Sequence, residues 1–214
     1  DFDKGAAILQ ERYPNIKILN VTAGADGSYS YSCGHRVFVP SFKLGETIED
    51  LKAVCDYFNK VGALAKEYGL KLGYHNHAFE YEVVDGQVKW EYMIENTDPE
   101  SVFFQMDVYW TTKGGKNPVE YLKKYTGRAP VVHLKDYYKE GEMEGDPYAL
   151  IGLNEGEAKP ASAFEFRPLG TGVQDIPSII IAAQENGSKW LVVEQANPSL
   201  QKTPLECIQM SIEY

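Results

Sequence analysis

The sequence predicts an α/β fold built as a β/α barrel. Short apolar segments alternate with amphipathic helical segments along the 214 residues, a pattern typical of a parallel sheet covered by helices. Polar residues directly follow several of the apolar segments, where barrel enzymes place their active sites. No glycine-rich phosphate turn follows any predicted strand, which favours a barrel over a doubly wound open sheet. No linker or repeat divides the chain, so we expect residues 1–214 to form a single domain.

The predicted elements succeed one another as β/α units do. Thr47 and Asp50 resemble a capping box, and apolar residues recur at helical spacing from Ile48 to Tyr68 before Gly69 ends the helix. The predicted strands are residues 16–22, 36–40, 70–77, 102–106, 131–135 and 190–194, and further helices are predicted at 90–96, 118–125, 179–185 and after Thr203. Residues 24–34 are a predicted loop, and residues 138–163 are predicted to be a long surface loop or lid.

Charge and composition narrow the functional class. Thirty-one acidic residues against twenty-one basic ones give a net charge of −10, which disfavours nucleic-acid binding. No apolar run is long enough to span a bilayer. The three cysteines, Cys33, Cys55 and Cys207, are widely spaced and are expected to be buried free thiols. The chain opens at Asp1 without a methionine, which indicates that its start is missing; we expect a cytoplasmic location, with a periplasmic one as the alternative because the N-terminus is missing.

Two histidines close the predicted strand 70–77. Because side chains alternate along a strand, His75 and His77 share one face, and Glu80 follows the strand end. The histidines could satisfy one another inside a barrel. The pair on one face with a carboxylate beyond it favours a functional site.

Further candidate site residues lie within or at the ends of the later predicted strands. Asp107 closes an apolar strand; it could cap a following helix, but we see no helical pattern in residues 111–118 and expect a site carboxylate instead. His133 and Lys135 share one face of the strand 131–135, where two buried basic groups are costly unless paired or functional. Asp136 is expected to face solvent or support the site, and Glu194 ends an aliphatic strand.

The candidates at the strand ends form a ligand set for a divalent cation. Glu80, Asp107, His133 and Glu194 offer three carboxylates and one imidazole. Oxygen-dominated ligands with one nitrogen favour Mn²⁺, Mg²⁺, Co²⁺ or Zn²⁺. The sequence does not choose among these metals.

Several motifs resemble those of a known family. YHNHAFEY, QMDVYW, GRAPVVHLKD and the later VVEQ occur in the order found in the sugar phosphate isomerase/epimerase family, the xylose isomerase-like TIM barrels. The resemblance covers about residues 36–214 and implies a TIM (β/α)8-type barrel. Residues 15–40 resemble its third and fourth strands, so we expect the first one or two β/α units to lie outside this chain. Asp107, His133 and Glu194 match the family's metal ligands, and Glu80 is assigned as the first ligand by proximity. Thr171, in the Gly170-Thr171-Gly172 turn, stands where many members have Glu.

The resemblance implies a metal-dependent sugar isomerase or epimerase that moves a proton next to a carbonyl through a cis-enediolate. Glu80 and Glu194 would be the acid/base pair, and His75, His77, Trp110 and Lys135 would bind a ketose or keto-glycoside. A dehydratase or lyase acting on a keto-sugar or keto-inositol, and a non-catalytic sugar-binding barrel, are the alternatives. The acidic charge disfavours an endonuclease of related architecture. A small carbohydrate is the expected partner, and a homo-oligomer is compatible with the sequence.

Overall fold

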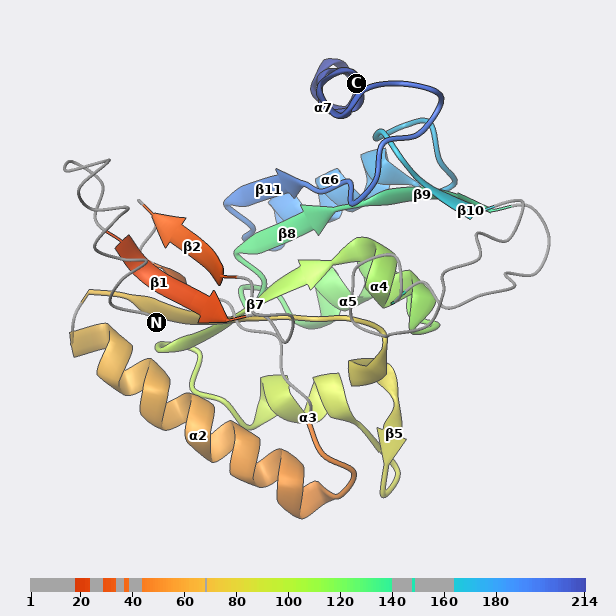
Figure 1. The fold of residues 1–214 in the computed structure, drawn as a ribbon. Helices are drawn as coiled ribbons and strands as arrows, with labels where there is room; N and C mark the ends of the chain where they lie inside the picture. Colours follow the sequence, from red (N-terminus) through yellow and green to blue (C-terminus); the bar gives the residue numbers. More distant parts are fainter. Residues whose placement is uncertain are drawn as a thin grey trace. The chain divides into compact units, whose positions relative to one another are not determined.

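In the computed structural model the chain divides into two compact units, each described here by itself (Figure 1). Unit 1 comprises Asp1–His75 and Val83–Phe104, and unit 2 comprises Asn76–Glu82 and Gln105–Tyr214. The structure describes residues 18–23, 29–33, 37–38, 44–67, 69–139, 148 and 164–214, the first three ranges by their backbone alone. Whether the whole chain is one domain stays a prediction.

Unit 1 combines a parallel strand pair with two helices. Strands β3 (Val37–Phe38) and β4 (Lys71–His75) pair in parallel. The other elements are two antiparallel pairs, β1 (Ile18–Ala23) with β2 (Tyr29–Cys33) and β5 (Val83–Val84) with β6 (Gln87–Val88), and the helices α2 (Ile48–Glu67) and α3 (Lys89–Glu95). Strand β7 (Val102–Asp107) begins in unit 1 and ends in unit 2.

Unit 2 is built on parallel strands. Strands β8 (Val131–Leu134) and β11 (Trp190–Val193) pair in parallel with each other, and β8 also pairs in parallel with the end of β7 (Figure 1). An antiparallel pair joins β9 (Asp136–Lys139) to β10 (Phe164–Arg167). The helical elements are η1 (Phe79–Tyr81), α4 (Val108–Lys113), α5 (Pro118–Lys124), α6 (Ile176–Glu185) and α7 (Pro204–Glu213). This confirms the predicted α/β class with parallel strands and helices.

Local sequence signals explain the helix boundaries. Asp50 N–H donates to Thr47 Oγ1, and Thr47 N–H donates to Asp50 Oδ2, each at 3.1 Å, as the capping pattern predicted. Thr203 and Glu206 form a full capping box at α7. Asn117 caps α5, which has Pro118 in its first turn. The predicted helices are therefore confirmed to within a few residues.

Two predicted loops contain strand residues, and one predicted strand pairs antiparallel. The strand predicted at 16–22 is present as β1, but it pairs antiparallel with β2, which falls within the predicted loop 24–34. In that segment Tyr29, Tyr31 and Cys33 alternate with serines, a strand period that the glycines and serines obscured. The predicted loop 138–163 begins inside β9, and β10 was not predicted at all. Residues 140–147 and 149–163 lie outside the described residues.

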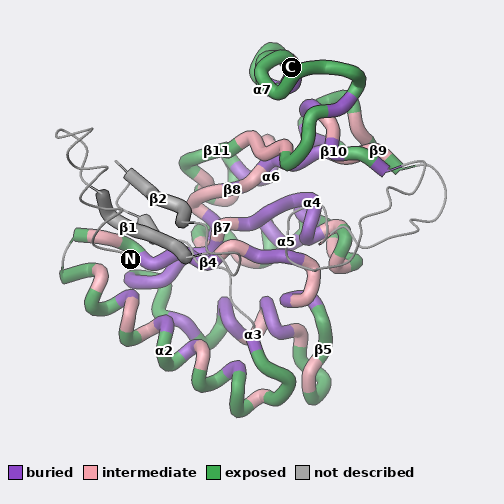
Figure 2. Tube along the Cα trace, viewed as in Figure 1, coloured by how far each residue is buried: buried purple, intermediate pink, exposed green. Residues whose placement is uncertain are grey.

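Buried residues occur in both units (Figure 2), and each unit has its own aromatic core. In unit 1, Tyr74 of β4 packs against Phe58 and Phe104, with ring centroids 5.5 and 6.4 Å away, and the Trp90 ring lies 4.8 Å from that of Phe104. In unit 2 the core cluster is Tyr109, Trp110, Phe164 and Phe166. Cys55 and Cys207 are buried free thiols, as predicted. Among the described helices, none is long and apolar enough to cross a membrane.

Gly73 in β4 is required by close packing. A Cβ at this position would overlap the aromatic ring of Phe103. We expect Gly73→Ala to lower the free energy of unfolding by about 1–3 kcal/mol, because the overpacked strand must shift. Chemical denaturation of Gly73→Ala, Phe103→Leu and the double variant measures this effect. In this double-mutant cycle, Phe103→Leu should recover much of the stability that Gly73→Ala loses. Purely additive changes in the free energy of unfolding would contradict the packing explanation.

Candidate metal centre

Three predicted site residues come from neighbouring strand ends of unit 2. The strand register places Asp107 of β7 opposite His133 of β8, and His133 opposite Val192 of β11. Glu194 follows β11 directly, and its N–H donates to Leu134 O at 3.0 Å. Because these parallel strands end at one edge, the three side chains converge there, as the sequence predicted.

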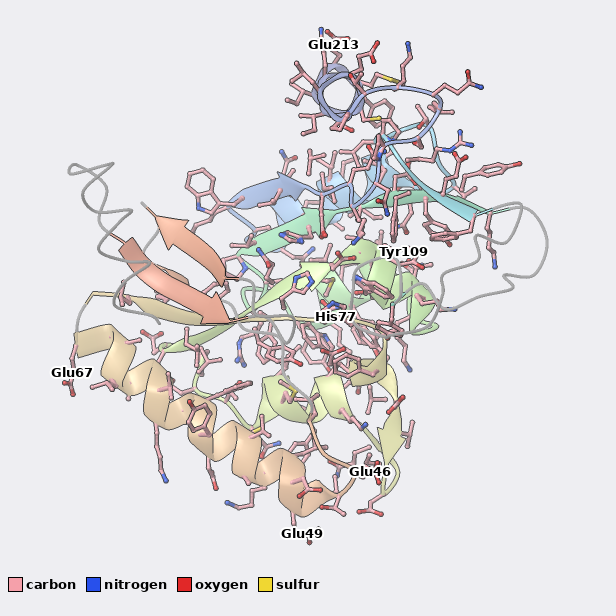
Figure 3. All side chains as sticks on the ribbon, viewed as in Figure 1. Glu46, Glu49, Glu67, His77, Tyr109 and Glu213 are labelled. Atoms are coloured by element: carbon pink, nitrogen blue, oxygen red, sulfur yellow. The ribbon has the colours of Figure 1, made fainter. Side chains whose placement is uncertain are left out.

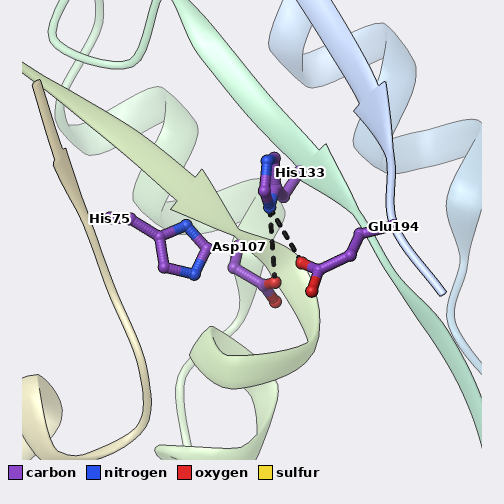
Figure 4. Close-up of side chains that lie close together, drawn as sticks. All are labelled: His75, Asp107, His133 and Glu194. Carbon is purple, nitrogen blue, oxygen red and sulfur yellow. Dashed lines mark hydrogen bonds and ion pairs between the residues drawn. The ribbon is translucent and has the colours of Figure 1, made fainter. Parts of the chain in front are cut away.

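The ligand atoms of these residues face one another (Figure 4). His133 Nδ1 lies 2.9 Å from Glu194 Oε2 and 3.9 Å from Asp107 Oδ2. One ligand atom from each of the three residues lies within 4.8 Å of the other two. Two carboxylates and an imidazole this close can share one cation. A non-catalytic sugar-binding barrel would be favoured if these three side chains lay too far apart to share an ion. Their short separation gives that alternative no support.

Asp107 is fully buried, and one of its oxygens is unsatisfied. Oδ1 accepts the Trp110 N–H at 2.9 Å and caps α4, while Oδ2 has no hydrogen-bond partner among the described residues. Burial raises the pKa of Asp107 to about 7, although the nearby Lys135 charge opposes this. An orphaned buried carboxylate oxygen directed at an imidazole is the environment that a cation completes. The residues present therefore fit a divalent metal.

The sequence analysis did not predict helix α4. We expected Asp107 to be a site carboxylate because no helical pattern was seen after it, but α4 starts at Val108 and Asp107 is its N-cap. A helix of only six residues with two threonines gives little periodicity. Asp107 therefore has both roles, with one oxygen for the cap and one for the site.

Buried polar side chains fix the backbone of Asp107. The Asp107 N–H donates to Asn76 Oδ1 at 2.9 Å, and Thr111 Oγ1 donates to Asp107 O at 2.7 Å. Thr111 Oγ1 also lies 2.7 Å from the hydroxyl of Tyr81. Asn76 and Thr111 are completely buried. The sequence analysis assigned no role to either residue; a polar side chain at a buried strand end was the only signal.

Lys135 and His133 hold Glu194 between them. Lys135 is 1% exposed, and its Nζ lies 3.1 Å from Glu194 Oε1. The ammonium also lies over the rings of Phe166, at 4.6 Å, and Trp110, at 5.5 Å. Burial by itself would raise the pKa of Glu194, but the His133 hydrogen bond and the Lys135 charge hold this pKa below its usual range. Glu194 is therefore an ionised carboxylate.

An aromatic wall adjoins this network. His77 stacks on Phe79, with the planes 8° apart and the centroids separated by 5.7 Å, and its ring lies 5.2 Å from that of Trp110. Burial, with the nearby charge of Lys135, lowers the pKa of His77 to about 4, so its ring is neutral. Trp110 is fully buried and stacks on Tyr148, with centroids 4.7 Å apart. Figure 3 labels His77 and Tyr109, the neighbour of Trp110 on α4.

Glu80 makes a backbone hydrogen bond in unit 2. Its Oε2 accepts the His77 N–H at 2.8 Å, which closes the turn before η1. Within unit 2 the possible metal ligands that lie within 4.8 Å of one another are Asp107, His133 and Glu194 (Figure 4). Glu80 as the first metal ligand and His75 as a substrate-binding residue stay predictions.

Asp136 anchors a loop and does not face solvent. It is completely buried, and its carboxylate accepts N–H groups from Tyr137, Gly170, Gly172 and Gln174 at 2.9–3.1 Å. A Cβ at Gly172 would overlap this carboxylate, so only glycine allows the approach. Thr171 donates its hydroxyl to Pro168 O. The Gly170-Thr171-Gly172 turn is thus tied to the residue after Lys135.

This geometry can be compared with that of known proteins. A model of the xylose isomerase-like TIM barrel family matches residues 15–213. The chain belongs to this family. The family and the barrel-type fold suggested by the motifs are thereby confirmed.

The names of individual relatives state the reactions of those proteins. An inosose dehydratase of Clostridium perfringens is 32% identical over 79% of this chain and 54% of its own length. An inosose dehydratase of Mesomycoplasma hyopneumoniae is 27% identical over the whole chain and 70% of its own length. A sugar phosphate isomerase/epimerase structure from Parabacteroides distasonis superposes with a TM-score of 0.65 and 28% identity, over 84% of this chain and 56% of that one. The chain spans about half the length of the first of these relatives.

Replacing Asp136 tests its anchoring role. Asp136→Asn supplies one acceptor oxygen in place of two, so buried N–H groups lose their partner. We expect the free energy of unfolding to fall by about 1–3 kcal/mol in chemical denaturation. Asp56→Asn, which alters an exposed ion pair with Lys52, is the control and should change it by less than about 0.5 kcal/mol. Equal effects of the two substitutions would contradict this role.

The raised pKa of Asp107 predicts a pH-dependent metal effect. Because the folded pKa lies above the ordinary 3.8, the stability that protonated Asp107 contributes is present below pH 4 and is lost as the pH rises through about 7. A cation binds the charged form, so Mn²⁺ should raise Tm more at pH 8 than at pH 5.5. At 100 times the Kd the stabilisation is about 2.7 kcal/mol.

Thermal denaturation with and without Mn²⁺ measures this difference. Asp107→Asn keeps the histidine titrations and removes the carboxylate, so it should lose most of the Mn²⁺ stabilisation at pH 8. A Mn²⁺ effect that is the same at both pH values in the unmodified protein would show that Asp107 is not a ligand.

Proposed function

We propose that the protein is a divalent-metal-dependent dehydratase acting on a cyclic polyhydroxy ketone of the inosose type. The observation that carries the proposal is the unsatisfied Oδ2 of buried Asp107, directed at His133 and beside Glu194. The names of the curated relatives favour water loss over the isomerisation that the sequence motifs suggested first. The substrate therefore combines a carbonyl with neighbouring hydroxyls.

Asp107, His133 and Glu194 would hold the metal. An imidazole nitrogen together with two carboxylates suits Zn²⁺, Co²⁺ or Mn²⁺ better than Ca²⁺. A bound divalent ion would attract the ketone oxygen and the negative charge that develops on it.

Glu194 would be the base that removes the proton next to the carbonyl. It is ionised, and it is held on one side by His133 and on the other by Lys135. A base that takes a proton from carbon must be fixed close to that carbon; with a metal bound, coordination would replace the His133 contact, and the Lys135 contact would remain. Glu80, predicted as the second base, would instead hold the turn that carries His77.

The aromatic wall would position the ring of the substrate. His77, with a neutral imidazole, would bind a hydroxyl without adding charge to the site. Trp110 is enclosed by Tyr148, so a substrate could cover its ring only after Tyr148 moved aside. We therefore assign Trp110 to shaping the wall, and His77 and Lys135 to contacting the substrate.

Sugar isomerisation or epimerisation is the second candidate, supported by the Parabacteroides distasonis structure and its name. It would use the same proton removal but would return the proton to carbon. The two functions are separated by the fate of the β-hydroxyl: a dehydratase expels it, and an isomerase or epimerase retains it.

Incubating an inosose with the Mn²⁺-loaded protein in D₂O tests the proposal. We expect deuterium at the carbon next to the carbonyl and a product lighter by one water, by NMR and mass spectrometry. Glu194→Gln should slow both deuterium incorporation and water loss at least about 100-fold, because it removes the base. The exposed Glu213→Gln is the matched control and should change neither rate.

Metal content is measured in each variant to separate loss of the base from loss of the ion. Deuterium incorporation without water loss would favour the isomerase or epimerase. Neither deuterium nor product from an inosose or a panel of ketoses would refute both functions.

A further inference from the structure

Lys135 is a buried cation that contacts the proposed base but does not itself take the α-proton. It lies at the end of β8, is 1% exposed, and its backbone carbonyl accepts the Gln174 side-chain amide at 2.9 Å. Its Nζ contacts Glu194 Oε1 and lies over the rings of Phe166 and Trp110. These contacts hold the ammonium beside the proposed base.

A purely structural role explains this arrangement poorly. A buried lysine and carboxylate both lose hydration, and such pairs add little net stability compared with apolar side chains of similar size. Here an apolar residue would also pack well, because the neighbours of the ammonium are aromatic rings. The ammonium is, however, a proton donor fixed 3.1 Å from an oxygen of the proposed base.

We propose that Lys135 donates the proton that converts the departing hydroxyl into water, and that the elimination is syn. The inference rests on the proposed dehydratase function. Glu194 takes the proton from the α-carbon, and the electron pair left behind forms the new carbon–carbon double bond. The β-carbon–oxygen bond breaks, and its oxygen takes a proton from the Lys135 ammonium and leaves as water.

The same contact restores the starting state. After the step Glu194 is protonated and Lys135 is a neutral amine, and their hydrogen bond of 3.1 Å allows the proton to pass back from carboxyl to amine. The substrate has then lost one hydrogen and one hydroxyl, and neither side chain has changed. No oxidant or reductant is needed.

The stereochemistry follows from the distance between donor and acceptor. With Nζ and Oε1 in contact, both groups lie on one side of the substrate ring. The hydrogen and the hydroxyl must therefore leave from the same face. A ring ketone with all its hydroxyls equatorial meets this condition, because the hydrogen on each carbon lies on the same face as the hydroxyl on the next.

Lys135→Met separates proton removal from water loss, since methionine keeps the shape of the stem and removes the donor. In the Mn²⁺-loaded variant, with all-equatorial inosose in D₂O, we expect deuterium exchange to fall less than about tenfold and water loss to fall at least about 100-fold more than exchange. Lys123→Met, an exposed lysine on α5, is the matched control and should leave both rates unchanged. Metal content should match that of the unmodified protein.

An analogue with fluorine at the β-carbon provides a rescue, because fluoride leaves without a proton. Lys135→Met should eliminate fluoride within about tenfold of the unmodified protein, which a merely structural lysine would not allow. Failure to eliminate fluoride, or equal losses of exchange and water elimination, would overturn the role of Lys135.

The unmodified protein tests the stereochemistry without any variant. An inosose epimer whose β-hydroxyl lies on the face opposite the α-hydrogen should exchange deuterium but lose water at least about 100-fold more slowly. Comparable water loss from both epimers would overturn the syn geometry. If the unmodified protein neither exchanges nor dehydrates the all-equatorial inosose, the proposed function itself fails, an outcome distinct from a failure of Lys135 alone.

Discussion

The site depends on the burial of one carboxylate, that of Asp107. A carboxylate without water is costly unless hydrogen bonds or opposite charges compensate it. One oxygen is compensated by the N–H of Trp110, and the other has His133 at 3.9 Å and no hydrogen bond. The raised pKa of Asp107 follows from its burial, and the proposed metal follows from the unequal hydrogen bonding of the two oxygens. A divalent ion is the partner that satisfies Oδ2 while leaving the carboxylate charged.

The surrounding structure keeps this carboxylate in place with neutral hydrogen bonds. Asn76 and Thr111 hold the backbone of Asp107 on both of its sides, and neither adds charge. Asp136, the residue after Lys135, fixes a loop in the same way. Its carboxylate accepts the N–H groups of Gly170, Gly172 and Gln174. Backbone N–H groups satisfy the Asp136 carboxylate, so the acidic and basic side chains of the proposed metal site itself are Asp107, His133, Glu194 and Lys135.

Strand periodicity was sufficient to predict where Asp107, His133 and Glu194 lie. Each follows an apolar run, and parallel strands bring such positions to one edge. It could not predict that the Glu80 carboxylate accepts the His77 N–H, because the turn after His77 sets that hydrogen bond. The antiparallel pairing of β1 and β2 was equally hidden, since pairing partners depend on long-range contacts. The short helix α4 lacked the length that periodicity requires.

Diffraction from crystals soaked in Mn²⁺, recorded at an energy where manganese scatters anomalously, tests the central claim most directly. The account predicts a single anomalous peak in contact with Asp107 Oδ2, His133 Nδ1 and Glu194, with the His133–Glu194 hydrogen bond replaced by coordination to the ion. No peak at this position, with the His133–Glu194 hydrogen bond intact, would contradict it.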